Sequence, residues 1–164
     1  MSMATFSGPM RSGTVRYGTP ATGRNVGLMV LTQSYEYVVS GTVTNPTNVD
    51  AIGMVLPQGA QIINILVDQV VVPTASSTST ISVGTTSGGA ELMVATATTA
   101  GGRFAPVPTT AIALAWQTST SADTPVYVRY AVAGGNTTAG RAIVTINYVQ
   151  RLPDGTVAPT YNNI

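Results

Sequence analysis

A period-two alternation of apolar residues, repeated in short segments, constrains the fold of this chain more than any other feature. It is clearest in 125–133 and 141–150, where Val, Ile, Tyr and Ala hold every second position, while Arg, Thr and Asn occur between them. Successive side chains of a β-strand point to opposite faces of a sheet, so this alternation predicts strands that bury one face in a core. Segments of this kind, bounded by Gly, Pro, Asn or Asp, predict an all-β domain.

Seven segments are rich in the β-branched and aromatic residues that are typical of strands. They cover residues 26–39, 51–56, 61–72, 80–85, 111–117, 125–133 and 141–150. The glycine-rich stretch 134–140 predicts a hairpin loop between the last two of them. A helical turn is expected only at 90–97, where β-branched residues are few and Glu91 lies near the start. Residues 101–110 are expected to form a loop.

The segment 61–72 is apolar on both of its faces. One face holds Ile63, Ile65, Val67 and Val71, and the other holds Ile62, Leu66, Val70 and Val72. A strand of this kind packs against the opposing sheet on one side and against another element or subunit on the other. We therefore expect this strand to lie in the core and to have a partner on its outer face.

About eight short strands, with Gly and Pro between them and almost no helix, predict an antiparallel β-sandwich. A jelly roll of about eight strands in two facing sheets suits this number, and an immunoglobulin-type sandwich is the alternative. We expect one such domain over residues 26–164, because a chain of 164 residues has the size of a single domain with one core.

The first 25 residues differ in composition from the rest, with many Gly, Pro, Ser and Thr and three of the seven arginines. Such a segment does not build a core of its own. Phe, Met, Arg and Tyr anchor protein interfaces, and Gly and Pro let a chain follow a foreign surface, which favours an extended arm over a frayed terminus. We expect residues 1–25 to form an extended arm that becomes ordered on a partner protein. Its expected contact residues are Phe6, Pro9, Met10, Arg11, Arg16, Tyr17 and Arg24.

Missing residue types exclude most catalytic chemistry. The chain has no Cys and no His, so it cannot form a thiol nucleophile, a Ser-His-Asp triad, a disulfide or a zinc finger. No two of its six acids lie within ten residues of each other, which disfavours a calcium site, and no glycine-rich phosphate-binding motif occurs. We expect no catalytic residues, no metal, no cofactor and no enzymatic activity.

Charged residues make up only 8% of the chain, and its net charge is +1. Affinity for nucleic acid or for an anionic membrane grows with each cation at the surface, so neither partner is expected. A sheet protein with so little charge is poorly protected against self-association. We therefore expect a cyclic homo-oligomer whose function is to bind other copies of itself and a scaffold. The longest apolar stretch is too short for a membrane helix and the N-terminus lacks the pattern of a secretory signal, so the expected compartment is the cytoplasm.

Several motifs resemble those of small structural proteins of tailed bacteriophages. They are 6–13 (FSGPMRSG), 25–27 (NVG), 30–34 (VLTQS), 56–62 (LPQGAQI), 81–85 (ISVGT) and 134–140 (GGNTTAG). Within this group the chain resembles the head decoration, or cement, proteins, which are jelly-roll subunits and often trimers. The resemblance implies a homotrimer that binds the major capsid protein on the outside of the expanded capsid, with the virion exterior as its final location and the host cytoplasm as its place of assembly.

Two other functions remain open at this stage. A tail or fibre subunit would recognise host-surface carbohydrate through the long loops expected at 73–80, 100–110 and 118–124. A glycan hydrolase would need two acids that meet across a cleft after folding. A shell-forming capsid subunit is disfavoured, because 164 residues are few for that role and a helix-rich pattern is missing.

Overall fold

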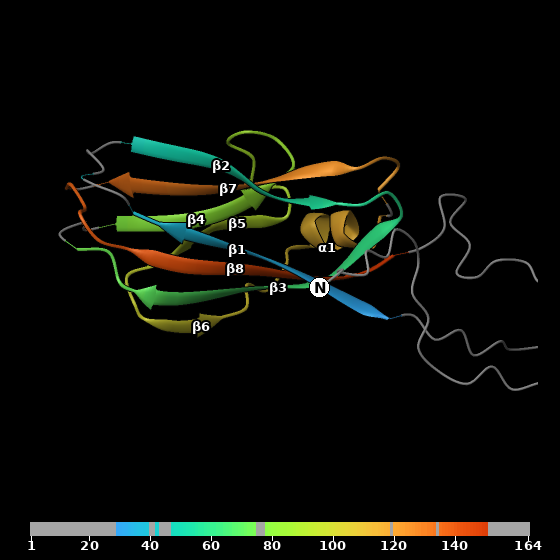
Figure 1. Cartoon of the computed structure of the whole chain (residues 1–164), viewed down its shortest axis with the longest axis horizontal. Coiled ribbons are helices and arrows are strands. Elements are labelled where there is room, and N and C mark those ends of the chain that lie inside the picture. The colour runs from blue at the N-terminus through green and yellow to red at the C-terminus, as the bar shows by residue number, and fades with distance from the viewer. Residues whose placement is uncertain are drawn as a thin grey trace, which may run out of the picture.

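Two four-stranded antiparallel sheets face each other in the computed structural model (Figure 1). The structure describes residues 29–39, 42, 47–74, 78–118, 120–133 and 135–150, with the backbone alone for 47–49. Within these ranges the elements are β1 (Val30–Val38), β2 (Thr47–Leu56), β3 (Ala60–Val71), β4 (Thr78–Gly84), β5 (Met93–Ala97), β6 (Gly102–Phe104), α1 (Thr110–Gln117), β7 (Thr124–Ala133) and β8 (Arg141–Gln150).

The strand order is that of a jelly roll. The first sheet has the order β1-β8-β3-β6 and the second has the order β2-β7-β4-β5. The first strand therefore pairs with the eighth, the second with the seventh, the third with the sixth and the fourth with the fifth. This nested pairing differs from the immunoglobulin arrangement and confirms the prediction of an eight-stranded jelly-roll sandwich.

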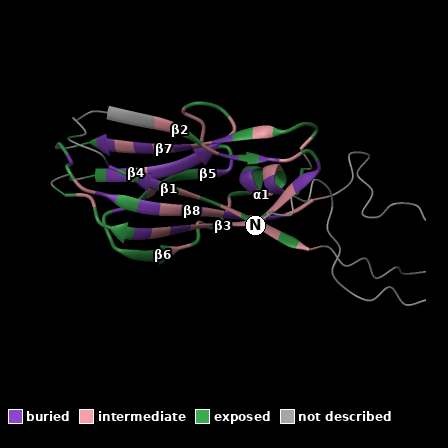
Figure 2. Cartoon of the chain, in the orientation of Figure 1, coloured by how far each residue is buried: buried purple, intermediate pink, exposed green. Residues whose placement is uncertain are grey.

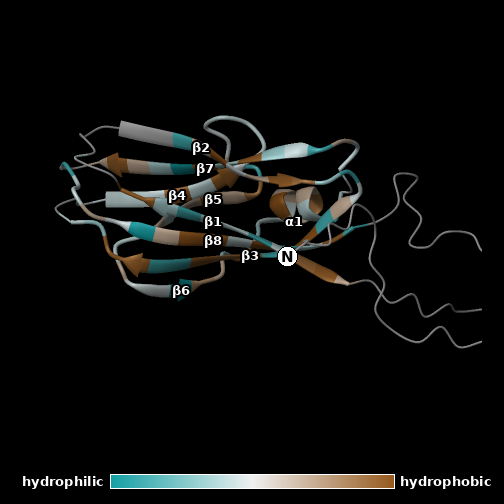
Figure 3. Ribbon diagram, in the orientation of Figure 1, coloured by the Kyte–Doolittle hydropathy of each residue, from teal (hydrophilic) through white to brown (hydrophobic). Residues whose placement is uncertain are grey.

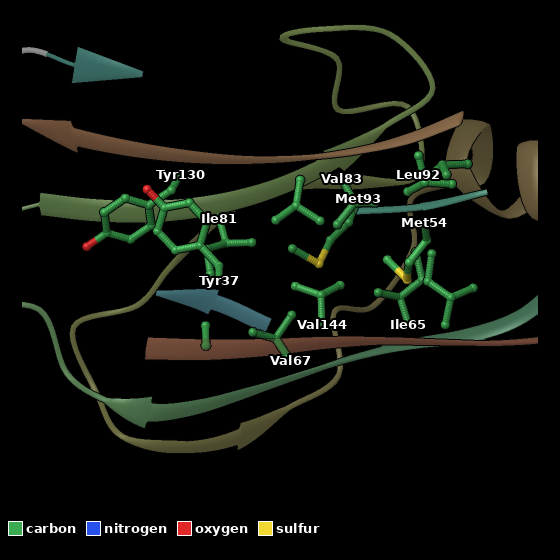
Figure 4. Close-up of a cluster of buried hydrophobic side chains, with 14 of the residues drawn as sticks. Tyr37, Met54, Ile65, Val67, Ile81, Val83, Leu92, Met93, Tyr130 and Val144 are labelled. Carbon is green, nitrogen blue, oxygen red and sulfur yellow. The ribbon is translucent and has the colours of Figure 1, made fainter. Parts of the chain in front are cut away.

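The core lies between the sheets and is built by the predicted alternation (Figure 2). Every second residue is buried from Val126 to Val132 in β7 and from Ala142 to Tyr148 in β8. The two sheets contribute buried side chains that meet in the middle, as the close-up in Figure 4 shows for Val67 and Val144 opposite Ile81 and Val83. The alternation thus gave the correct inward face for both C-terminal strands.

The predicted hairpin at 134–140 is wrong. β7 pairs with β2 and β4 in the second sheet, whereas β8 pairs with β1 and β3 in the first. The segment between them crosses from one sheet to the other. Glycine-rich sequences indicate that a chain reverses direction, but they do not show whether the two flanking strands hydrogen-bond to each other.

Two elements near the middle of the chain have the opposite type to the one predicted. Residues 111–117 belong to the helix α1 and not to a strand, and 93–97 form a strand at the edge of the second sheet and not a helical turn. The helix begins after Thr109, whose hydroxyl accepts a hydrogen bond from the Ile112 amide, and it buries Ile112 and Trp116 four positions apart. The predicted loop at 101–110 contains the short strand β6, which pairs with β3.

The pattern in β3 is interrupted by two register shifts against β8, one between Ile62 and Asn64 and one between Gln69 and Val71. Ile65 and Val67 are fully buried as predicted, but Ile63 is 46% exposed and Val71 is also exposed. A bulge adds a residue to one strand and so changes the face on which later or earlier side chains lie. The prediction that all four residues share one face is therefore wrong for Ile63 and Val71.

One end of the sandwich, which we call the α1 end, is closed by the helix, the turn at 57–59 and the loop at 85–92 (Figure 1). In the turn, the Ala60 amide donates to the Pro57 carbonyl at 3.0 Å, and Gly59 has a φ of 82°, a left-handed conformation that suits glycine. The described chain also begins and ends here, since Val30 lies opposite Val149 in the pairing of β1 with β8.

Candidate functional site at the α1 end

A groove of about 370 Å³ lies at the α1 end, between the helix and the ends of the two sheets. Its lining comes from four segments, of which the last two are neighbours in sequence. They contribute Leu56, Ala60 and Ile62 from the turn region, Thr85, Glu91 and Leu92 from the loop at 85–92, Ala115 and Thr118 from the end of α1, and Thr120, Ser121 and Thr124 from the segment before and at the start of β7.

The groove has an apolar floor and a rim of hydroxyl groups. Leu56, Ala60 and Leu92 are almost fully buried, so they form the floor, while the Thr and Ser residues stand nearer to solvent. The indole Nε1 of Trp116 donates a 2.8 Å hydrogen bond to the carbonyl of Leu92 and so fixes the helix against the loop. An apolar floor with polar groups around it is the usual make-up of a binding groove.

Glu91 supplies the carboxylate of this groove. It accepts hydrogen bonds from the Thr86 hydroxyl at 3.0 Å and from the Thr85 amide at 3.2 Å. Burial acts to raise the pKa of Glu91, but hydrogen bonds from its own amide, Thr86 and Thr85 outweigh it, and the pKa is lower than the ordinary value. A carboxylate with a lowered pKa is ionised at neutral pH, so the groove carries one negative charge.

The loop that carries Glu91 is held from its other side by an ion pair on the second sheet. Arg129 donates from Nε to Asp50 Oδ1 at 2.7 Å and from Nη2 to Asp50 Oδ2 at 3.1 Å. The Ser87 hydroxyl of the loop donates to the same Asp50 Oδ2 at 2.9 Å. Gly88, with a φ of 80°, lies so close that a Cβ there would be 2.6 Å from Arg129 Nη2. The pair therefore fixes the loop to the outer face of the second sheet.

Two further ion pairs lie on the first sheet, both between neighbouring strands. Arg103 of β6 binds Asp68 of β3 with two hydrogen bonds of 2.6 and 3.0 Å, and Arg141 of β8 pairs with Glu36 of β1. Three of the five acids in the described ranges thus form ion pairs with arginine. Among these residues no group of three or more acids comes together. These three carboxylates form contacts between neighbouring strands.

The sequence-predicted arm residues Phe6, Pro9, Met10, Arg11, Arg16, Tyr17 and Arg24 all lie outside the described residues, and the arm remains a prediction. Sequence reasoning missed the groove, because it assigned 111–117 to a strand and 90–97 to a helical turn. The spacing of Ile112 and Trp116, behind a possible Thr cap, is the signal that would have found α1.

Exposed apolar side chains surround the α1 end. Val30 at the start of β1 is 54% exposed and Leu114 on α1 is 60% exposed, and the start of β1 is visible as a hydrophobic segment in Figure 3. Within the described ranges, no helix has the length and apolar character needed to cross a bilayer. Removing apolar side chains of this kind from water costs little free energy. They are therefore suited to contact with another protein.

Comparison with known proteins gives structural but not sequence relatives. No family model matches the chain, and no curated protein matches it. A chain in the capsid of Ralstonia phage GP4 is similar with a TM-score of 0.55 and 19% identity, over 75% of this chain and 85% of that one. A chain in the capsid asymmetric unit of cyanophage Pam1 has a TM-score of 0.49 and 21% identity, over 87% and 98%. A chain in the acid-stable capsid of Helicobacter pylori bacteriophage KHP30 has a TM-score of 0.46 and 17% identity, over 75% and 94%. The jelly-roll fold of this chain is thus the fold of a chain in the GP4 capsid.

Proposed function

We propose that this protein is a structural component of a phage virion, a decoration protein that binds the outside of the expanded capsid and stabilises it. The observation that carries the proposal is the fold shared with a chain of the GP4 capsid at a TM-score of 0.55. The low charge of the chain, 8% of its residues, supports a role in which much of the surface is covered by other proteins.

The proposed mechanism is physical and involves no chemical step. A protein that binds only the expanded arrangement of capsid subunits stabilises that arrangement by mass action. In a homotrimer, three copies of the arm over residues 1–25 attach together, and such multivalency raises the overall affinity by a factor of about 10² to 10⁴ over a single contact. The major capsid protein is the proposed partner, and the capsid exterior is the proposed location.

The position of the chain ends suggests which side of the subunit faces the shell. Val30 and Val149 lie opposite each other at the α1 end, so residues 1–28 and 151–164 both connect to the sandwich there. If the subunits of a trimer lie side by side with their strands parallel to the symmetry axis, all three arms are on the same side. We propose that the α1 end faces the capsid and that the opposite end of the sandwich faces outward.

Binding to expanded capsids that lack this protein tests the proposal. The full chain should sediment with these capsids and should raise the temperature at which they lose their DNA. A variant without residues 1–20 should fail to sediment with them, while its circular dichroism and its oligomeric mass show an intact β fold and assembly. A variant without residues 157–164 serves as the matched control and should still bind.

Retained binding by the variant without residues 1–20 would overturn the role of the arm. No binding of the full chain to expanded capsids would overturn the decoration function as a whole. Binding of the isolated full chain to host cells, in the absence of capsids, would instead support a tail or fibre subunit that recognises a surface carbohydrate.

A further inference from the structure

The charges of this chain are unevenly divided between the sandwich and the rest. The described ranges contain three arginines and five acids, a net charge of −2, and the remaining residues contain four arginines and one acid, a net charge of +3. All three arginines of the sandwich form ion pairs, with Asp50, Asp68 and Glu36. The excess negative charge of the sandwich therefore resides on the other two acids, Glu91 and Asp123.

Both of these acids lie at the α1 end. Glu91 lines the groove, and Asp123 stands between Ser121 and Thr124, which also line it. Their hydrogen-bond donors are uncharged: Thr85 and Thr86 donate to Glu91, and the Gln58 amide donates to Asp123 at 2.9 Å. Within the described ranges neither acid pairs with an arginine. In the described part of the chain, the groove thus presents the carboxylate of Glu91 above an apolar floor, without an arginine paired to it.

The chain itself carries a segment that complements this groove. Residues 1–28 contain Arg11, Arg16 and Arg24, no acid, and the apolar or aromatic residues Phe6, Met10 and Tyr17. Residues 151–164 contain one arginine and one acid and so have no net charge. Arginine pairs well with carboxylates because its planar guanidinium donates two parallel hydrogen bonds, and its methylene groups pack on apolar surface.

We propose that the groove at the α1 end binds the segment 1–28 of a second copy of this chain, with one of its arginines against Glu91. This inference rests on the homo-oligomer of the proposed function and adds one contact between neighbouring subunits to those that the sandwich domains make with each other. The guanidinium lies on the rim at Glu91, and the apolar part of the segment covers the floor at Leu56 and Leu92.

The segment is long enough to reach a second copy. β1 begins at Val30 and runs from the α1 end into the sandwich, so the segment 1–28 joins the sandwich at the end that carries the groove (Figure 1). A segment of 28 residues spans up to about 90 Å when extended, well beyond the roughly 40 Å length of a 12-residue strand. In a ring of subunits with their α1 ends side by side, the segment 1–28 of each subunit is attached near the groove of the next. If every subunit binds the segment of its neighbour in this way, the ring closes.

The absence of cysteine from the natural chain allows a direct test by disulfide trapping. Ser121→Cys places a thiol on the groove, where the Ser121 residue is exposed. Gly13→Cys, Gly18→Cys and Gly23→Cys each place a thiol close to one arginine of the segment. Each glycine variant is co-expressed with the Ser121→Cys chain, one of the two carrying a mass tag, and the purified full-length oligomer is oxidised. Thr99→Cys, exposed at the opposite end of the sandwich, is the matched control.

At least one of the three pairs should give a disulfide-linked heterodimer, several-fold more than the same glycine variant gives with Thr99→Cys. Glu91→Gln should lower the heterodimer yield several-fold, whereas Glu36→Gln should leave it unchanged. An increase in ionic strength from about 0.15 to about 1 M, which shortens the Debye length from about 8 to about 3 Å, should lower it as well.

Equal yields with Ser121→Cys and Thr99→Cys would overturn the proposal. A chain that carries both Gly23→Cys and Ser121→Cys and forms only an intrachain disulfide would show that the segment binds its own groove, which also overturns it. Capsid binding is measured on the same preparations. Cross-linked oligomers that do not bind capsids would contradict the decoration function alone, and capsid binding without cross-linking would contradict the segment exchange alone.

Discussion

The rings of Tyr37 and Tyr130 stack across the sandwich, with their centroids 4.9 Å apart and their planes at 28° to each other. Tyr37 belongs to β1 of the first sheet and Tyr130 to β7 of the second, so this contact joins the two layers of the core (Figure 4). Both residues are buried. Stacked aromatic pairs contribute about 0.5 to 1.5 kcal/mol beyond the burial of their area.

Stability should fall at alkaline pH because of this pair. Burial, together with the nearby Tyr130 and Tyr35, raises the pKa of Tyr37 to about 12, and burial raises the pKa of Tyr130 as well. The folded state therefore holds the phenolic proton more tightly than the unfolded state. Its stabilising effect is complete below pH 10, the ordinary tyrosine value, and is lost as the pH rises toward 12.

Urea unfolding at a series of pH values between 8 and 12 measures this loss, which should reach about 2 kcal/mol near the upper end. Tyr37→Phe keeps the ring and removes the titrating group, so its stability should decline less over the same range. Parallel curves for the two proteins would show that Tyr37 does not titrate in this way.

Asp50→Asn should loosen the loop at 85–92 more than it affects the rest of the domain. The substitution weakens both hydrogen bonds from Arg129 and the one from Ser87, and it leaves the Arg129 guanidinium without a charge partner. Limited proteolysis should cut this loop faster, and Tm should drop by several degrees. Asp68→Asn is the control, since its partner Arg103 is 66% exposed and surface pairs contribute little.

The same ion pair predicts a response to acid. The hydrogen bonds from Arg129 hold the pKa of Asp50 below its ordinary value, so its stabilising effect is present above pH 4 and is lost as the pH falls through the lowered pKa. Proteolysis of the loop should therefore increase toward pH 3 with an acid-stable protease in the natural protein. In Asp50→Asn, the loop should be cleaved fast above pH 4 as well as near pH 3.

Two isoleucines in β3 should respond very differently to the same change. Ile65 is fully buried, so Ile65→Ala should lower the free energy of unfolding by about 2 to 5 kcal/mol. Ile63 lies at the register shift and is half-exposed, so Ile63→Ala should change it by no more than about 0.5 kcal/mol. Denaturant titration of both variants provides the comparison, and a large loss for Ile63→Ala would mean that the bulge is misplaced or that a partner covers this residue.

The elements that were predicted best are strands that bury one face against the opposing sheet. In β7 and β8, period-two alternation identified the buried faces, because each of these strands packs against the opposing sheet with one side only. The prediction failed at β3, where bulges shift the register, and at α1, where alanine and isoleucine suit a strand or a helix until a cap and a packing surface decide.

The groove was beyond sequence reasoning for a different reason. Leu56, Glu91 and Ala115 come from segments that are 24 or more positions apart, and only the closure of two sheets brings them to the same end. The ion pair of Asp50 with Arg129, 79 positions apart, likewise follows from the pairing of β2 with β7.

The sequence by itself determined the all-β class, the faces of the clearest strands and the absence of thiol and imidazole chemistry, since each of these depends on residue type and local spacing. Only the tertiary structure decided the strand order, the crossing at 134–140 between sheets, the helix at the end and the groove with Glu91 on its rim. Those features depend on which distant segments pair, and pairing is a property of the whole core and not of any one stretch of chain.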